Sequence, residues 1–137
     1  MTDIEEARRI FSKDRYAMAT TGIEIEEVAH RYAKCSLKLD NRHKNAVGLV
    51  MGGAIFTLAD FVFAVATNFR QPVTITVSSQ INFLDIPKGS ILYGESMIMK
   101  DGRNTCFYEI IITDNLNTLV AVVTTVGKRL EPLNNKA

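Results

Sequence analysis

The sequence has no excess of charge of either sign and no apolar run long enough to span a membrane. It contains 16 Lys and Arg residues against 15 Asp and Glu residues, so its formal net charge is +1. Because the basic residues are scattered, nucleic acid is not an expected partner. The apolar runs stop well short of the roughly 20 residues of a transmembrane helix, so a membrane is not an expected partner either.

The chain also lacks the features of a secreted, disulfide-bonded or metal-binding protein. Its first residues, Met-Thr-Asp-Ile-Glu-Glu-Ala-Arg-Arg, do not show the basic-then-apolar order of a signal peptide, and we expect a cytoplasmic location. Its two cysteines, Cys35 and Cys106, have no Cys or His neighbour at metal-ligand spacing. We therefore expect packed, reduced thiols, with no metal and no redox cofactor.

The remaining composition is that of an ordinary folded domain. Of 137 residues, 47% are hydrophobic and 23% are charged, which is enough for a real core. The sequence shows no internal repeat, low-complexity tract or linker. We expect a single domain over residues 1–137, with an N-terminal helical segment over 1–19 and a loose tail over 130–137.

Hydrophobic periodicity predicts two helices and six strands. The first helix covers residues 3–18, capped by Thr2 or Asp3. Strands over 22–28 and 32–39 form a hairpin, a polar loop covers 40–50, and a long helix runs from Gly52 to about Asn68. Further strands are predicted over 73–83, 91–100, 104–113 and 118–128, with turn residues between them. This order predicts an α+β fold in which an antiparallel sheet wraps around one long central helix.

The predicted long helix is apolar on its wide face and small or polar on the other. The small face permits close approach of another backbone or of a ligand, so a subunit interface is expected there. Asp60 lies on this face, and a carboxylate inside such a helix is costly unless it serves chemistry. The pair Gly52-Gly53 leaves the backbone N–H groups of the first turn uncovered, and these can bind an oxyanion. Together these features indicate acyl-transfer hydrolysis.

One spaced pattern runs from the polar loop into the predicted long helix, and its residues are Asn45, Gly48, Gly52, Gly53, Leu58, Ala59 and Asp60. A later pattern is Ser79-x-Ile81-x-Phe83-Leu84-x-x-Pro87-x-Gly89. In the first pattern and in its order of elements, the chain resembles the hotdog-fold thioesterases of the phenylacetate-degradation (PaaI-like) type. The later pattern is similar to the long third strand of that family and its following turn, and the resemblance covers roughly residues 20–129.

The resemblance implies a catalytic role for four residues. Asp60 corresponds to the catalytic carboxylate, acting as a general base on water or as a nucleophile on the thioester. Gly52 corresponds to the residue whose N–H polarises the carbonyl, and Asn45 to the loop amide that positions the carboxylate or water. Ser78 lies where some relatives hold the attacking water. In the family, the active sites are shared across a homodimer, which can assemble further as a dimer of dimers.

One departure from the family concerns Met51. The family usually has His before the glycine pair, and a thioether neither donates a hydrogen bond nor carries a proton. We expect activity to be retained, with altered rate or specificity, because the main-chain donors do not depend on this side chain. Met51 and Gly53 are expected to contact substrate, since Met also fits an apolar acyl or aryl group.

Coenzyme A is expected as part of the substrate and not as a cofactor. Its phosphates need cations, and Lys88, Arg103 and Lys128 lie at predicted turns or strand ends. Each of the three also fits an ordinary surface charge.

Each candidate has a structural alternative. Asp60 could pair with a cation at an interface, the glycine pair could serve tight packing, Asn45 could be a turn amide, and Ser78 a plain strand hydroxyl. His30 and His43 are expected to be solvated.

Two rival functions stay open. One is a non-catalytic acyl-CoA-binding protein, which Met51 favours. The other is a hotdog dehydratase or hydratase, and the lack of a His in the predicted helix counts against it. The sequence does not identify the acyl group or separate coenzyme A from acyl-carrier-protein substrates.

Overall fold

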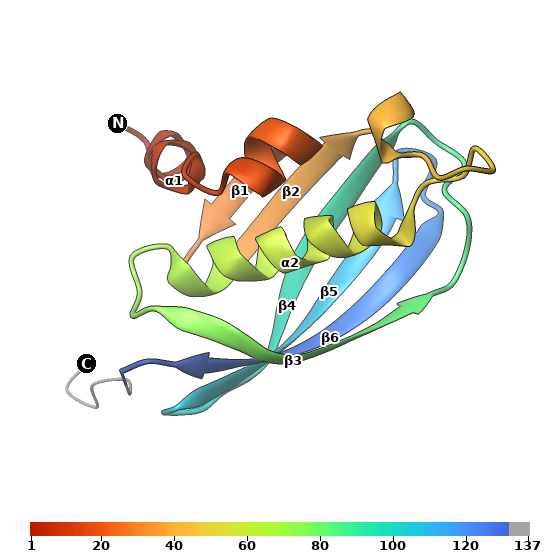
Figure 1. Ribbon diagram of the computed structural model, residues 1–137. Coiled ribbons are helices and arrows are strands. Elements are labelled where there is room, and N and C mark those ends of the chain that lie inside the picture. Colours follow the sequence, from red (N-terminus) through yellow and green to blue (C-terminus); the bar gives the residue numbers. More distant parts are fainter. Residues whose placement is uncertain (132–137) are drawn as a thin grey trace.

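A curved antiparallel sheet of six strands packs around one long helix in the computed structural model, which describes residues 1–131 (Figure 1). The strand order is β1-β2-β4-β5-β6-β3, with every neighbouring pair antiparallel. The predicted α+β arrangement is confirmed, and the strands lie within two residues of their expected bounds. They are β1 (Ile23–Ala29), β2 (Tyr32–Lys38), β3 (Thr74–Phe83), β4 (Ile91–Asp101), β5 (Thr105–Asp114) and β6 (Leu119–Arg129).

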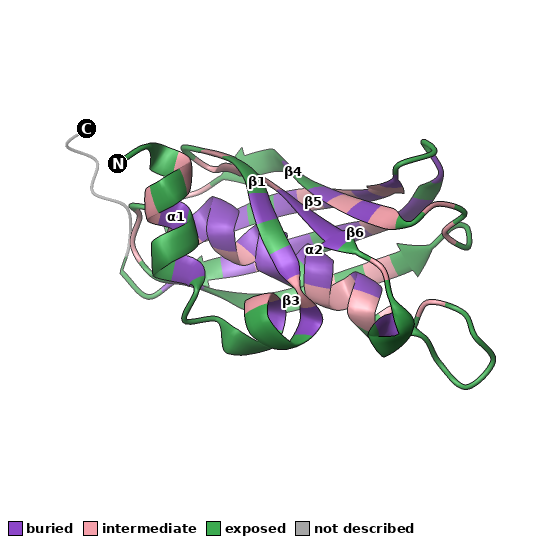
Figure 2. Ribbon diagram, turned by 90° about the horizontal axis from the view of Figure 1, so that it is seen from above, coloured by how far each residue is buried: buried purple, intermediate pink, exposed green. Residues whose placement is uncertain are grey.

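The central helix α2 (Gly52–Asn68) has the predicted bounds. Its apolar stripe is buried on the concave face of the sheet, and Figure 2 shows buried residues running along its length. Gly94 of β4 permits the close approach of helix and sheet, because a Cβ there would lie 2.9 Å from Cγ2 of Val62 and 3.1 Å from Cδ1 of Ile112. Fully burying one Val side chain contributes about 1.5–3 kcal/mol, so the contact of Val62 at Gly94 helps to hold α2 on the sheet.

The N-terminal segment differs from the single helix predicted over 3–18. Helix α1 (Asp3–Phe11) begins at the Thr2 cap, which exchanges hydrogen bonds with Glu5 in a capping box. It ends after Phe11, where the Oγ of Ser12 donates to the Arg9 carbonyl at 2.7 Å and competes with the continuing helix. A short π-helix, η1 (Tyr16–Thr21), follows and leads into β1 through Gly22.

Both thiols are packed in the core, as predicted. Cys35 and Cys106 are buried, and burial raises the pKa of each thiol above its ordinary value. No helix within residues 1–131 is both long enough and apolar enough to cross a bilayer. The loose tail predicted over 130–137 falls, for residues 132–137, outside the described residues.

Candidate active site

The N-terminus of α2 is open. Met51 precedes the helix in an extended conformation and gives no side-chain cap. The Met51 carbonyl accepts from the N–H groups of Ala54 and Ile55 at 3.0 and 3.3 Å. The preceding N–H groups, those of Gly52 and Gly53, find no acceptor among the described residues, as is usual for a first helical turn. These two donors are available to an anion or a polarised carbonyl oxygen.

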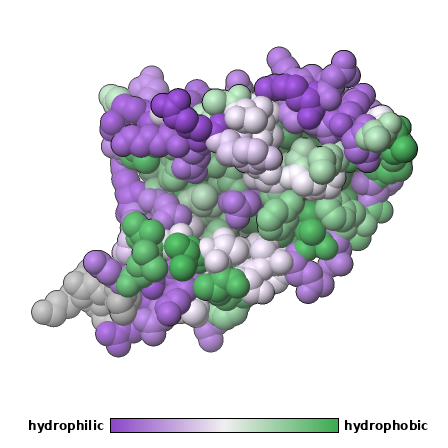
Figure 3. All heavy atoms as spheres, viewed as in Figure 1, coloured by the Kyte–Doolittle hydropathy of each residue, from purple (hydrophilic) through white to green (hydrophobic). Residues whose placement is uncertain are grey.

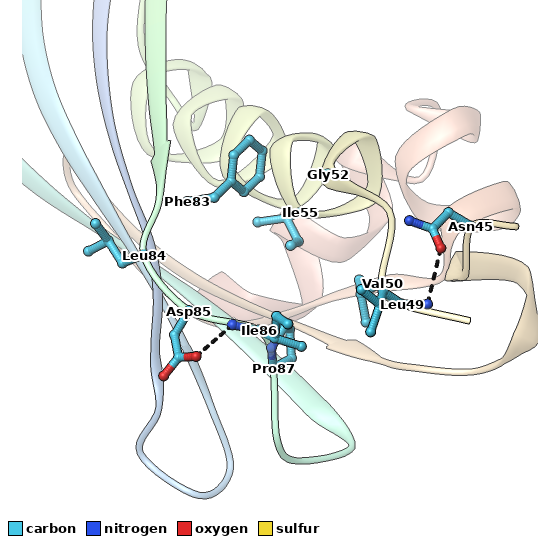
Figure 4. Close-up of a pocket in the computed structure, with 10 residues that line it drawn as sticks. All are labelled: Asn45, Leu49, Val50, Gly52, Ile55, Phe83, Leu84, Asp85, Ile86 and Pro87. Atoms are coloured by element: carbon cyan, nitrogen blue, oxygen red, sulfur yellow. Dashed lines mark hydrogen bonds between the residues drawn. The ribbon is translucent and has the colours of Figure 1, made fainter. Parts of the chain in front are cut away.

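A pocket of about 530 Å³ opens beside this helix end (Figure 4). Gly52 forms part of its wall, and a Cβ on Gly52 would lie 3.0 Å from Cζ of Phe83, so a side chain at this position would displace the phenyl ring. The pocket is mostly apolar and lies between the loop before α2 and the segment after β3. Its lining residues are Asn45, Leu49, Val50, Gly52, Ile55, Phe83, Leu84, Asp85, Ile86 and Pro87.

Asn45 shares this pocket with Gly52 and also holds its own loop together. Its Oδ1 accepts hydrogen bonds from the backbone N–H groups of Val47 and Leu49 at 3.0 and 3.1 Å. Its own backbone N–H donates to the Leu49 carbonyl at 2.8 Å. The amide oxygen is therefore engaged within the chain, and the Nδ2 group is the part of Asn45 suited to a ligand.

Asp60 lies in a different pocket, of about 290 Å³, together with Tyr16, Thr57 and Ala64. The residue keeps an exposed surface, but the surrounding protein still removes water from its carboxyl group. This burial raises the pKa of Asp60, and the negative charge of Asp14 raises it further. In one chain Asp60 and Gly52 lie two helical turns apart, about 12 Å along the axis, so one chain does not bring them together.

The remaining predicted site residues are dispersed. Met51 and Gly53 line a third pocket of about 480 Å³, and 57% of the Met51 surface is exposed. Ser78 is exposed on β3 beside a bulge and lines none of these three pockets.

The predicted cations lie at two ends of the sheet. Lys88 is exposed before β4, with its Nζ 3.3 Å from the Asp85 carboxylate. Arg103 lies in the β4–β5 turn, and Lys128 is paired with Thr105 at that same end (Figure 1). Within one chain, therefore, these three cations do not form one phosphate site.

His43 is not solvated, contrary to expectation. It is 4% exposed, its Nδ1 accepts from the Asp40 backbone N–H at 3.0 Å, and its Nε2 lies 2.7 Å from the Thr21 carbonyl oxygen. Because a carbonyl oxygen only accepts, Nε2 is the ring nitrogen that donates to Thr21. His43 thus ties the loop before α2 to η1. One signal in the sequence could have indicated that His43 is held in place. Asp40, three positions earlier, forms a capping pair with it.

The fold matches solved hotdog structures. Escherichia coli PaaI, from the phenylacetic acid degradation operon, is 21% identical, with 95% of each chain covered and a TM-score of 0.85. A Streptococcus pneumoniae protein, described as a hypothetical thioesterase with coenzyme A, is 22% identical, with 90% of this chain and 99% of that chain covered and a TM-score of 0.81. The resemblance drawn from the sequence is confirmed for the fold.

Two sequence comparisons agree with this placement. An Archaeoglobus fulgidus protein named "Putative esterase" is 26% identical over 120 residues, which cover 87% of this chain and 78% of that protein. The sequence profile of the family described as "Domain of unknown function (DUF4442)" matches residues 8–125. This chain, a hotdog fold with an open central-helix N-terminus, therefore belongs to the DUF4442 family.

Proposed function

We propose that this protein hydrolyses acyl- or aryl-coenzyme A thioesters to the free acid and coenzyme A. The observation that carries the proposal is the placement of Asp60, the sole charged residue of α2, on the small face of a helix whose N-terminus is open. The named esterase relative and the structural neighbour with coenzyme A support the same reaction class.

Asp60 acts as the general base in the simplest version of the reaction. Its carboxylate takes a proton from water while the water oxygen attacks the thioester carbonyl carbon. The tetrahedral intermediate then collapses, the carbon–sulfur bond breaks, and the thiolate takes the proton from Asp60. The raised pKa of Asp60 makes its carboxylate a stronger base for the first step. The proton that Asp60 gains from water is the one that it returns to the thiolate in the second step. Direct attack by Asp60, followed by hydrolysis of the anhydride, is the alternative route.

Gly52 supplies the oxyanion site. Its N–H group, at the positive end of the α2 dipole, stabilises the charge that develops on the carbonyl oxygen. Removing one such donor in other hydrolases costs about 10²- to 10³-fold in rate. Since this donor belongs to the backbone, Met51 in place of the family's usual His leaves it intact.

Two chains build each site in this proposal, and the edge strand β3 supplies the contact. β3 ends the sheet order and exposes apolar side chains, among them Ile75 and Val77 at 46% and 55%. Figure 3 shows hydrophobic residues gathered on the face that carries α2 and β3. A long apolar edge of this kind is a template for pairing with another chain.

The opposite edge of the sheet is protected. β1 carries the charged residues Glu24, Glu26 and Glu27, and the guanidinium of Arg8 on α1 donates to the Ile25 carbonyl at 2.8 and 3.0 Å. Antiparallel pairing of β3 with its copy would place the two α2 helices side by side. Asp60 of one chain would then face Asn45 and Gly52 of the other, and a dimer of dimers is the larger assembly.

The apolar pocket beside Gly52 suits the acyl or aryl group, because Leu49, Ile55 and Phe83 form its walls. Met51 and Gly53 contact the thioester side, and Ser78 holds the attacking water. Lys88, or the pair Arg103 and Lys128 at the other end of the sheet, binds the phosphates of coenzyme A.

The test is thiol release from short- and long-chain aliphatic, phenylacetyl and benzoyl coenzyme A thioesters. We expect turnover by the native chain and a loss of about 10²- to 10⁴-fold in Asp60→Asn. Glu131→Gln, which removes an exposed carboxylate outside the site, is the matched control and keeps full activity. Near-normal turnover by Asp60→Asn would contradict the mechanism. Binding without turnover by the native chain would favour a non-catalytic acyl-CoA-binding protein.

A further inference from the structure

A second carboxylate shares the pocket of Asp60. Asp14 comes from the link between α1 and η1, far from Asp60 in sequence, yet both residues line the same 290 Å³ pocket with Thr57. Two acidic side chains in one small pocket repel each other when both are ionised.

The position of Asp14 is fixed by its backbone. Its N–H donates to the Phe11 carbonyl at 2.9 Å, and its carbonyl accepts from the N–H of Met18 at 3.0 Å. The same segment is anchored on α2, because the ring of Phe11 meets the ring of Phe61 edge-on with centroids 6.2 Å apart. Phe61 directly follows Asp60, so this aromatic contact fixes the N-terminal segment beside the carboxylate.

The charges around the pocket are few. The N-terminal segment contributes Asp14, Arg15 and the phenol of Tyr16, and α2 contributes Asp60 as its one charged residue. Burial raises the pKa of both carboxyls, and Asp14 adds to the effect on Asp60.

We propose that Asp14 is a positioning residue for Asp60, whose negative charge strengthens Asp60 as the base that accepts a proton from water and returns it to the departing thiolate sulfur. This inference rests on the proposed role of Asp60. Asp14 itself touches no reacting atom. Its effect on the reaction passes entirely through the proton affinity of its neighbour.

The experiment measures the pH dependence of kcat/KM for the native chain, Asp14→Asn, Asp14→Glu and the control Glu131→Gln. In Asp14→Asn we expect the acidic limb to move to lower pH and kcat at the plateau to fall by less than tenfold, against about 10²- to 10⁴-fold for Asp60→Asn. Asp14→Glu keeps the negative charge, so the acidic limb of its kcat/KM profile is expected at the same pH as in the native chain. Thermal melting verifies that each variant is folded.

A second readout does not need turnover. Carboxyl carbon NMR follows the titration of Asp60, and its midpoint is expected to fall in Asp14→Asn and to stay in place in Glu131→Gln. An unchanged Asp60 titration together with an unchanged acidic limb overturns the inference while leaving the proposed function standing. A native chain without turnover overturns the proposed function, and with it the influence of Asp14 on the reaction, whatever the titration shows.

Discussion

The carboxylate of Asp114 accepts a hydrogen bond of 2.9 Å from the backbone N–H of Gly89. Its Oδ2 also accepts from the backbone N–H of Lys88, and its Oδ1 accepts from the backbone N–H groups of Leu116 and Thr118. Asp114 is 2% exposed. One buried side chain thus joins the β5–β6 turn to the β3–β4 connection, whose earlier residues form the wall of the apolar pocket.

Replacing Asp114 by Asn should destabilise the fold. The amide nitrogen would face N–H groups that now donate to oxygen, leaving buried donors unsatisfied at about 1–3 kcal/mol each. We expect the free energy of unfolding to fall by about 2–4 kcal/mol, measured by urea denaturation. Glu131→Gln, an exposed change outside these hydrogen bonds, is the control. Equal stability of the native chain and Asp114→Asn would contradict this role.

The same carboxylate should make stability depend on pH. Burial alone would raise the pKa of Asp114, but the four backbone hydrogen bonds outweigh it and hold the pKa well below its usual range. Because the folded pKa lies below the unfolded value of about 4, the stabilisation is complete above that value and is lost as the pH falls toward the folded pKa. Urea titrations at about pH 6 and about pH 3 should show that the free energy of unfolding falls more between these pH values for the native chain than for Asp114→Asn. Equal losses would argue against Asp114 as the source.

Sequence reasoning succeeded where one local pattern decides the structure. Gly52 and the apolar stripe after it defined α2, and alternating strands defined the sheet. It failed where distant segments meet. The hydrogen bond from His43 to Thr21 and the approach of Asp14 to Asp60 both depend on η1 folding back over α2. Local spacing pairs His43 with Asp40, but it reports neither the contact of His43 with Thr21 nor the pocket that Asp14 shares with Asp60.

Met51→His tests the departure of this chain from the PaaI-like thioesterases that its sequence resembles. The Met51 side chain is exposed at the rim of its pocket, so an imidazole fits there without displacing the core. We expect kcat/KM on the preferred thioester to be retained or raised, because the added ring can orient the thioester or the leaving thiolate. Loss of more than tenfold would contradict this expectation and would mean that Met51 has a packing role in the site. The control Leu116→His, in an exposed turn, leaves kcat/KM unchanged.

A charge placed on the edge strand β3 should separate the two chains of the proposed dimer. Val77 is 55% exposed on β3, and Lys at this position would put a charge on the apolar edge that the proposed pairing buries. Size-exclusion chromatography with light scattering is expected to show a dimer or tetramer for the native chain and a folded monomer for Val77→Lys. Leu116→Lys adds the same charge at an exposed turn and keeps the native assembly. Because Asp60 and Gly52 act across the interface in the proposed mechanism, the monomer should also lose thioester turnover. A fully active monomer would require both groups to act within one chain, which their separation along α2 opposes.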